Sequence, residues 1–391
     1  MKFSISIPIF LVILSNFQVL SASDTSVLGI KDDLGTWEKH ETKLSSARSN
    51  LAAASAGDYA IFAGGIDSNG EKSDIVDMFN FKDSSIRNVS LSESRSDIGS
   101  GTFHKGRYAI FAGGKKKDNE LSSVVDIYDS LTDKWKVLHM KQPRSNPLVL
   151  DIGKKLVIFG GVLSSPPFIS NVIDYFDEDL NQTDGTQDAF PYPIHGIGAG
   201  NDVLNNGVIL GGYMNIEPES NVPNFTPNNQ TLFYTGDYDS DTIGLKTMQT
   251  MSHAKFGMTG ALSLDIFIFG GGFTQSTQDG SIVESDEVYG YNTRRHDYAN
   301  INLKLSEPRS YIYSGGIQRF VLFWGGGSSK SLDVFNSVNQ KMEPTQQKLF
   351  LSVAREYAAS TVLKECMFFV AGGYNAENCE ITDTIEYIKV C

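Results

Sequence analysis

The sequence predicts an all-β protein built from seven copies of one four-stranded antiparallel unit, and three observations lead to this fold class. The pentapeptide Ile-Phe-Ala-Gly-Gly occurs at 61–65 and again at 110–114. Pairs of glycines then recur along the whole chain at intervals of 47 to 59 residues. No segment shows helical periodicity. A period near fifty residues, made of short apolar runs, is typical of repetitive β architectures.

Each repeat carries markers for four strands. The first members of the glycine pairs are Gly64, Gly113, Gly160, Gly211, Gly270, Gly325 and Gly372. The apolar run that ends in each pair, such as 155–161, predicts a second strand covered on both faces. About sixteen residues upstream, a motif such as 47–50 opens the first strand. An acidic residue before an aromatic marks the third strand, as at 124–130, and a weaker fourth strand follows at 133–139. Seven such repeats predict a seven-bladed β-propeller.

These markers resemble the kelch repeat, in which a double glycine ends the second strand and a tyrosine and a tryptophan follow in the third and fourth strands. The resemblance covers essentially the whole chain after its N-terminal leader. Tryptophan stands in a fourth-strand position only at Trp37 and Trp135, and the fourth and fifth repeats are irregular. The resemblance therefore predicts the fold more firmly than it predicts where the strands of the fourth and fifth repeats begin and end.

The double glycine has a structural explanation. Residues without a Cβ can take left-handed backbone angles and let a neighbouring backbone approach closely where the second strand turns away. Two other glycine-rich segments, at 196–200 and 325–331, lack the strict spacing and the following helix of a phosphate-binding loop. We therefore expect no nucleotide site.

The two ends of the chain are expected to meet in one blade. The seventh repeat stops after its third strand, at 383–390, and an unassigned segment at 35–43 precedes the first repeat. That segment should complete the last blade, because ring closure removes a free sheet edge. Cys366 begins the second strand of this blade and Cys391 ends the third, so we predict a disulfide between them. Cys379 is left as a thiol.

The N-terminus has the composition of a leader. Lys2 precedes an apolar stretch at 7–14, and small residues follow at 21–23. This order predicts a secretory signal peptide over 1–22, with 23–391 forming a single propeller. A membrane anchor is the alternative, but the apolar run is shorter than the roughly eighteen residues that a span needs. We expect a secreted, extracellular protein without a membrane span.

Charge and glycosylation motifs fit this compartment. The net charge is −13, which argues against nucleic acid or an anionic membrane surface as a partner. Asn-x-Ser/Thr triplets, which accept N-linked glycans, begin at Asn88, Asn181, Asn224 and Asn229.

A basic residue opens the first strand of every repeat, and strand direction places all of them on one face. These first-strand cations are Arg48, Arg95, Arg144, His195, Lys255, Arg309 and Arg355. Two long loops, 213–229 and 273–285, rise from the same face. One interpretation is an anion-binding mouth. The other, which the sequence favours, is a structural ion pair per blade with the recurring third-strand carboxylates. Those carboxylates are Asp77, Asp126, Asp174, Asp333 and Glu386.

Catalytic and metal motifs are sparse. Secreted kelch-like propellers include copper radical oxidases, which need two histidines, two tyrosines and a cysteine beside the metal. The six histidines of this chain are scattered, one or fewer per blade, and all three cysteines lie in the last blade. We expect no metal and no cofactor. Neither His-Glu-x-x-His nor Gly-x-Ser-x-Gly occurs, so zinc and serine hydrolase chemistry has no support.

The sequence therefore favours a secreted, non-catalytic binding or scaffolding protein. An extracellular protein or an acidic glycan would dock on the loop-rich face of the propeller. The alternative is a carbohydrate-active enzyme with its site at the same channel mouth, where His195 and the neighbouring arginines would handle a carboxylated sugar. Architecture alone does not separate these classes, because function resides in sites grafted on a fold.

Overall fold

The computed structural model describes residues 34–152, 154–184 and 250–391, apart from 277–279, 294, 296 and 376, together with residue 229 and the strands between 198 and 247. The described residues are all-β, interrupted by short 3-10 turns. The predicted signal peptide, His195, Gly211 and Asn224 lie outside the described residues.

The strands form seven four-stranded antiparallel sheets within the described residues. The first contains β2 (Ala52–Ala56), β3 (Tyr59–Ala63), β4 (Ile75–Asn80) and β5 (Ile86–Ser90). The second contains β6 (Gly99–Phe103), β7 (Tyr108–Ala112), β8 (Val124–Asp129) and β9 (Lys134–His139). The third contains β10 (Leu148–Ile152), β11 (Lys155–Phe159), β12 (Ile173–Phe176) and β13 (Gln182–Thr183).

The remaining sheets follow the same order along the chain. The fourth contains β14 (Gly198–Asn201), β15 (Gly207–Leu210), β18 (Thr231–Gly236) and β19 (Ile243–Thr247). The fifth contains β21 (Thr259–Ser263), β22 (Ile266–Gly270), β25 (Glu287–Asn292) and β26 (Asp297–Lys304). The sixth contains β27 (Tyr313–Ile317), β28 (Phe320–Trp324), β29 (Leu332–Asn336) and β30 (Lys341–Glu343). The seventh contains β32 (Ala359–Leu363), β33 (Met367–Ala371), β35 (Thr384–Lys389) and β1 (Glu38–Lys43).

Short hairpins and bridging strands extend some of these sheets. They are β16 (Tyr213–Asn215) with β17 (Phe225–Pro227), β20 (Lys255–Phe256) with β23 (Phe273–Gln275) and β24 (Ile282–Glu284), and β31 (Arg355–Glu356) with β34 (Tyr374–Asn375). The two long segments expected as loops, 213–229 and 273–285, thus contain paired strands.

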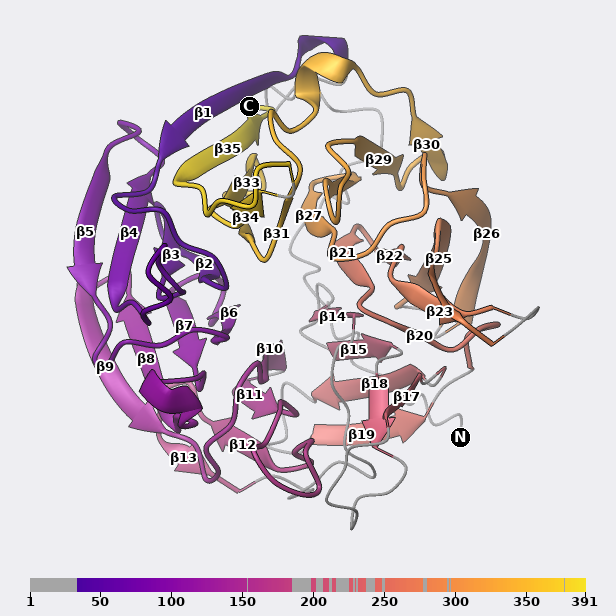
Figure 1. Cartoon of the computed structure of the whole chain (residues 1–391). Helices are drawn as coiled ribbons and strands as arrows, with labels where there is room; N and C mark the ends of the chain where they lie inside the picture. The colour runs from indigo at the N-terminus through magenta and orange to yellow at the C-terminus, as the bar shows by residue number, and fades with distance from the viewer. Residues whose placement is uncertain are drawn as a thin grey trace, which may run out of the picture.

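The sheets stand side by side with their first strands innermost. In Figure 1, β2, β6 and β10 lie toward the interior and β5, β9 and β13 toward the outside. Each first strand contacts the first strand of the next sheet, from β2 to β6 and onward to β32, which in turn contacts β2. This arrangement of small antiparallel sheets is consistent with a β-propeller.

Second strands form the core, as their continuous apolar runs predict. Every residue of β7, β22, β28 and β33 is buried. These strands are covered on both faces because each sheet packs against a neighbour, which is why their apolar residues do not alternate with polar ones. Trp324 in β28 is fully buried in this core.

The N-terminal strand completes the seventh sheet, as predicted. Strand β1 pairs with β35, with Glu38 opposite Lys389 and Lys43 opposite Thr384. Trp37, which precedes β1, is fully buried and packs edge-on against Phe320 of the sixth sheet at 5.2 Å between ring centroids. Residues 37–43 therefore join two sheets that are otherwise formed by the last repeats of the chain.

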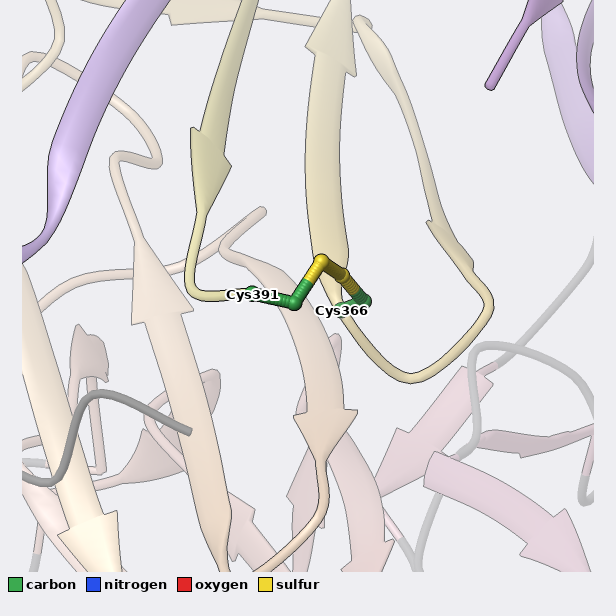
Figure 2. The surroundings of a disulfide bond; sticks show 2 residues. All are labelled: Cys366 and Cys391. Atoms are coloured by element: carbon green, nitrogen blue, oxygen red, sulfur yellow. A yellow bond between two sulfur atoms is a disulfide. The ribbon is translucent and has the colours of Figure 1, made fainter. Parts of the chain in front are cut away.

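The predicted disulfide is present in this sheet. Cys366 precedes β33 and Cys391 follows β35, and their sulfurs are bonded (Figure 2). Their Cα atoms lie 5.6 Å apart, within the usual range. Cys379 is an exposed free thiol.

Glycine pairs lie where two sheets meet. Gly64 has a φ of +65°, and a Cβ there would lie 2.5 Å from the carbonyl oxygen of Arg95 in the next repeat. The N–H of the second glycine, Gly65, donates to that same carbonyl at 2.8 Å. In the fifth repeat this role falls to Gly271 and Gly272, so the pair begins one residue later than the sequence indicated, because Gly270 still belongs to β22.

Candidate functional site

Six of the seven first-strand cations are described, and all six are buried. Their side chains are at most 2% exposed, and each contacts a carboxylate. The pairs are Arg48 with Asp77, Arg95 with Asp126, Arg144 with Asp174, Lys255 with Glu287, Arg309 with Asp333 and Arg355 with Glu386.

The network around Arg95 shows what these pairs do. Its guanidinium donates to Asp126 and to the carbonyl oxygens of Gly113, at 2.6 Å, and Val124, at 2.9 Å. The backbone N–H of Ser92, in the link from the preceding sheet, donates to the same carboxylate at 3.2 Å. Burial lowers the pKa of Arg95, and the charge of Asp126 opposes this shift. The Arg95 pair therefore joins the glycine turn, the third strand and the link between sheets. Arg48 and Arg355 likewise donate to carbonyls of their glycine turns, whereas Arg144 and Arg309 donate to carbonyls of their second strands.

Burial decides between the two interpretations of these cations. An arginine enclosed by backbone carbonyls and a carboxylate presents no charge to a ligand in solvent. The ion-pair interpretation describes Arg48, Arg95, Arg144, Arg309 and Arg355, and we give them no part in a binding surface.

The fifth repeat departs from this pattern. Tyr289 lies opposite Phe269 in the sheet, just as Asp77 lies opposite Phe62, so a tyrosine replaces the carboxylate. Lys255 instead contacts Ser285 and lies 2.8 Å from Glu287. Burial lowers the pKa of Lys255, while the bonds to Glu287 oppose this. Burial also raises the pKa of Tyr289 to about 12.

A pocket of about 450 Å³ adjoins this cluster. His253, Glu287 and Lys304 line it, together with residues of β23 and β24. His253 Nδ1 lies 3.4 Å from a carboxylate oxygen of Glu287. The pocket thus combines both charge signs on the face where the second and third strands are connected. Sequence reasoning missed it because it read Lys255 as one more copy of the repeated arginine.

A second set of side chains surrounds the inner end of the first strands. The residue two positions after each described cation has a left-handed backbone, and we call these six the mouth positions. Their φ values are +51° at Asn50, +53° at Asp97, +48° at Asn146, +62° at Gly257, +52° at Tyr311 and +55° at Tyr357. The conformation is set by the repeat, whereas the side chain varies from one repeat to the next.

Backbone hydrogen bonds link neighbouring mouth positions. The N–H of Asn50 donates to the carbonyl of Tyr357 at 2.8 Å, that of Asp97 to Asn50 at 3.2 Å, and that of Asn146 to Asp97 at 2.8 Å. The rings of Tyr357 and Tyr311 then contact each other, with centroids 5.8 Å apart. Five of the six mouth positions, from Tyr311 to Asn146, therefore form a continuous arc of aromatic and small polar side chains. The mouth positions are part of the first-strand motifs in the sequence. Without the backbone angle, however, the sequence does not show that they are more exposed than the cation two residues earlier, which is buried.

The glycosylation motifs occupy different environments. Asn181 is exposed, in a turn between the third and fourth strands of its sheet. Asn88 is also exposed, but its amide donates to Asp77 at 2.6 Å, within the first ion-pair network. Asn229 is partly buried and lies 3.4 Å from the carbonyl of Met251.

Metal ligands and membrane spans were sought in the same described residues. They contain no group of three or more histidine, cysteine, aspartate or glutamate side chains that could hold a metal ion. Within them, no helix is long and apolar enough to cross a membrane.

Comparison with known proteins gave no family model that matches this chain. No curated protein matches it either.

Proposed function

We propose that the chain is a kelch-like, seven-bladed β-propeller that is secreted and glycosylated and acts as a non-catalytic binding or scaffolding protein. Seven four-stranded sheets, first strands in contact all around, and glycine turns at the junctions that the structure describes support the architecture. The disulfide and the exposed sequon at Asn181 support an oxidising, secretory environment.

The binding face is the one that carries the first-strand starts. The observation behind this choice is that the non-repeated side chains collect there: the tyrosines at the mouth, and the charged pocket of the fifth repeat. A rigid scaffold that holds variable side chains at fixed backbone positions binds with little loss of conformational entropy. An extracellular protein or a glycan is the expected partner. The first-strand cations were the reason to expect an acidic glycan, and the six that the structure describes are buried.

Affinity capture followed by footprinting tests this proposal. The secreted, glycosylated protein would be immobilised, incubated with its source fluid, and its bound proteins and glycans identified by mass spectrometry. Hydroxyl-radical footprinting of the complex should protect Tyr311 and Tyr357, at the mouth. Leu264, in the turn between β21 and β22 at the other end of a first strand, should stay reactive. Protection of Leu264 alone, or no bound partner, would contradict the proposal.

The alternative, a carbohydrate-active enzyme, is supported by the fifth-repeat pocket, where His253 and Glu287 lie side by side. Turnover on a panel of oligosaccharides that is lost in Glu287→Gln would favour it. No turnover by the wild-type protein would leave binding as the function.

A further inference from the structure

Tyrosine is an unexpected residue at two of the mouth positions. A left-handed backbone suits glycine, asparagine and aspartate, and four of the six mouth positions carry one of these. At Tyr311 and Tyr357 the φ values are +52° and +55°, where a bulky side chain is disfavoured. Tyrosine is disfavoured at this backbone angle, yet it occurs there in two adjacent repeats. We therefore look for a role of its side chain that explains its presence.

Burial does not supply that reason. Tyr311 is 42% exposed and Tyr357 is 45% exposed, so neither ring fills the core. Within the part of the chain that the structure describes, neither hydroxyl makes a hydrogen bond. The rings contact each other, and Tyr311 also stands edge-on to Phe273, at 5.7 Å. Phe273 stacks in turn on the buried Phe256, at 5.1 Å. The exposed ring of Tyr311 thus contacts both the exposed ring of Tyr357 and the less exposed ring of Phe273.

Planar polar groups continue the arc beyond these rings. Asn50 follows Tyr357 through the backbone hydrogen bond described above, and its amide donates to the carboxylate of Asp97 at 3.1 Å. Asn146 comes next and is exposed. An amide offers both donors and acceptors, and a carboxylate offers acceptors. The arc therefore passes from aromatic faces to hydrogen-bonding groups without a first-strand cation at the surface.

We infer that Tyr311 and Tyr357 form a stacking platform for the ring of a neutral sugar. The C–H face of a pyranose packs on an aromatic face, while its hydroxyl groups need partners that both donate and accept. Asn50 and Asp97 provide those partners. A uronic or sialic acid fits less well, because Glu284 and Glu356 act electrostatically on Tyr311, and Lys115, the cation beside the polar end of the arc, already lies 3.7 Å from the carboxylate of Asp97. This inference rests on the proposed binding function and names its ligand class.

Substitution by the residue that other repeats use gives the sharpest test. Tyr311→Asn with Tyr357→Asn places asparagine where Asn50 and Asn146 already occupy the same backbone conformation. The double variant should fold with an equal or higher melting temperature, because it relieves the left-handed strain. Phenylalanine at both positions keeps the stacking faces and serves as the conservative variant. Leu264→Asn is the matched control, because Leu264 also has a positive φ, +54°, and is 49% exposed, but lies at the opposite end of its strand.

The measurement is binding to a glycan array of neutral, sialylated and uronic oligosaccharides, followed by calorimetric titration with chitotriose, mannotriose and lactose. The wild-type protein, the phenylalanine variant and Leu264→Asn should bind at least one neutral glycan with similar affinity. The Asn double variant should bind it at least tenfold more weakly. Equal affinity in the double variant, or binding of charged glycans only, would overturn the inference.

The outcomes also separate this inference from the proposed function. A captured protein partner, with no neutral glycan bound by the wild type, would refute the sugar platform and leave the binding protein intact. Failure of the wild type to bind any glycan and any partner would refute both. A large fall in melting temperature of the double variant would show that the tyrosines are structural, which also overturns the platform.

Discussion

At the scale of single residues, a buried cation–carboxylate pair recurs in six of the repeats that the structure describes. Desolvating two charges costs several kcal/mol, so such a pair adds little net stability, yet the loss of one partner leaves an uncompensated buried charge. Here each guanidinium also satisfies backbone carbonyls at a junction between sheets. The pairs therefore specify how neighbouring sheets meet more than they stabilise the fold.

Removal of one buried cation should be severe. We expect Arg95→Ala to lower the free energy of unfolding by about 3 to 5 kcal/mol, because Asp126 and two backbone carbonyls would lose their partner in the interior. Lys43→Ala, which removes the solvent-exposed pair with Asp383, should change it by less than about 1 kcal/mol. Urea denaturation measures both. Equal effects would show that burial of Arg95 has no energetic consequence.

A buried carboxylate should make stability depend on pH. Burial raises the pKa of Asp151, in β10, to about 6, although the backbone N–H of His104 donates to it at 3.0 Å. In the unfolded chain the pKa is about 3.9, so the folded state holds this proton more tightly between about pH 4 and 6. The free energy of unfolding contributed by Asp151 therefore falls as pH rises through that window.

The isosteric variant Asp151→Asn isolates this contribution, since it cannot ionise. Denaturation of both proteins from pH 4 to 7 should show the variant gaining stability relative to the wild type up to about pH 6, and a constant difference above it. Parallel curves across the whole range would mean that Asp151 ionises normally in the folded protein.

At the scale of elements, the glycine turn is the unit that lets one sheet pack on the next. Gly113 has a φ of +64°, and a Cβ there would overlap the carbonyl oxygen of Arg144 and lie 2.9 Å from Met140. Gly70 also has a positive φ, +81°, but no atom lies within 4 Å of the place where its Cβ would be. Both glycines have a positive φ, but only Gly113 lies close to atoms of the next repeat.

This contrast predicts the cost of adding a methyl group. Gly70→Ala should destabilise the protein by about 1 kcal/mol, from backbone strain alone. Gly113→Ala should cost clearly more, because the backbone of the third repeat must also move. Thermal unfolding of the two variants checks this, and a Gly113 variant no less stable than the Gly70 variant would argue against close approach as the role of the glycine pair.

At the scale of the whole molecule, the first and last strands that the structure describes lie in the seventh sheet. Strand β1 adds the outer edge to β35, Trp37 packs into the core beneath it, and the disulfide joins Cys391 to the start of β33. The chain end is thereby held covalently as well as by strand pairing. We therefore expect that a change which weakens this sheet will affect the cooperative unfolding of all the sheets.

Loss of the disulfide should lower stability without abolishing the fold. The bridge closes a segment with a sequence separation of 25, for which loop-closure entropy is worth about 3 kcal/mol. Cys366→Ser with Cys391→Ser should lower the denaturation midpoint accordingly, whereas Cys379→Ser should leave it unchanged because Cys379 is exposed and unpaired. Intact-mass analysis after alkylation should find one reactive thiol in the native protein. Three reactive thiols would contradict the bridge.

Local pattern was enough to predict the four strands per repeat, the glycine turns, the pairing of the terminal strand and the disulfide. These features recur at a roughly constant spacing. Hydrophobic runs and glycines with positive φ can be recognised from a few consecutive residues, without knowledge of the tertiary structure. One misplacement, at Gly270, arose where three glycines follow one another and only strand pairing with β25 distinguishes them. The segments 213–229 and 273–285, expected as loops, also proved to contain paired strands.

The sequence by itself thus determined that this chain is an array of small antiparallel sheets, and how its two ends are joined. Only the tertiary structure decided which side chains of the first-strand motifs face solvent. Arg309 and Tyr311 are two residues apart, yet one is sealed against Asp333 by the neighbouring strands and the other projects from a left-handed turn into the mouth. Burial depends on what the next sheet covers, and that is a property of packing between repeats rather than of any one repeat.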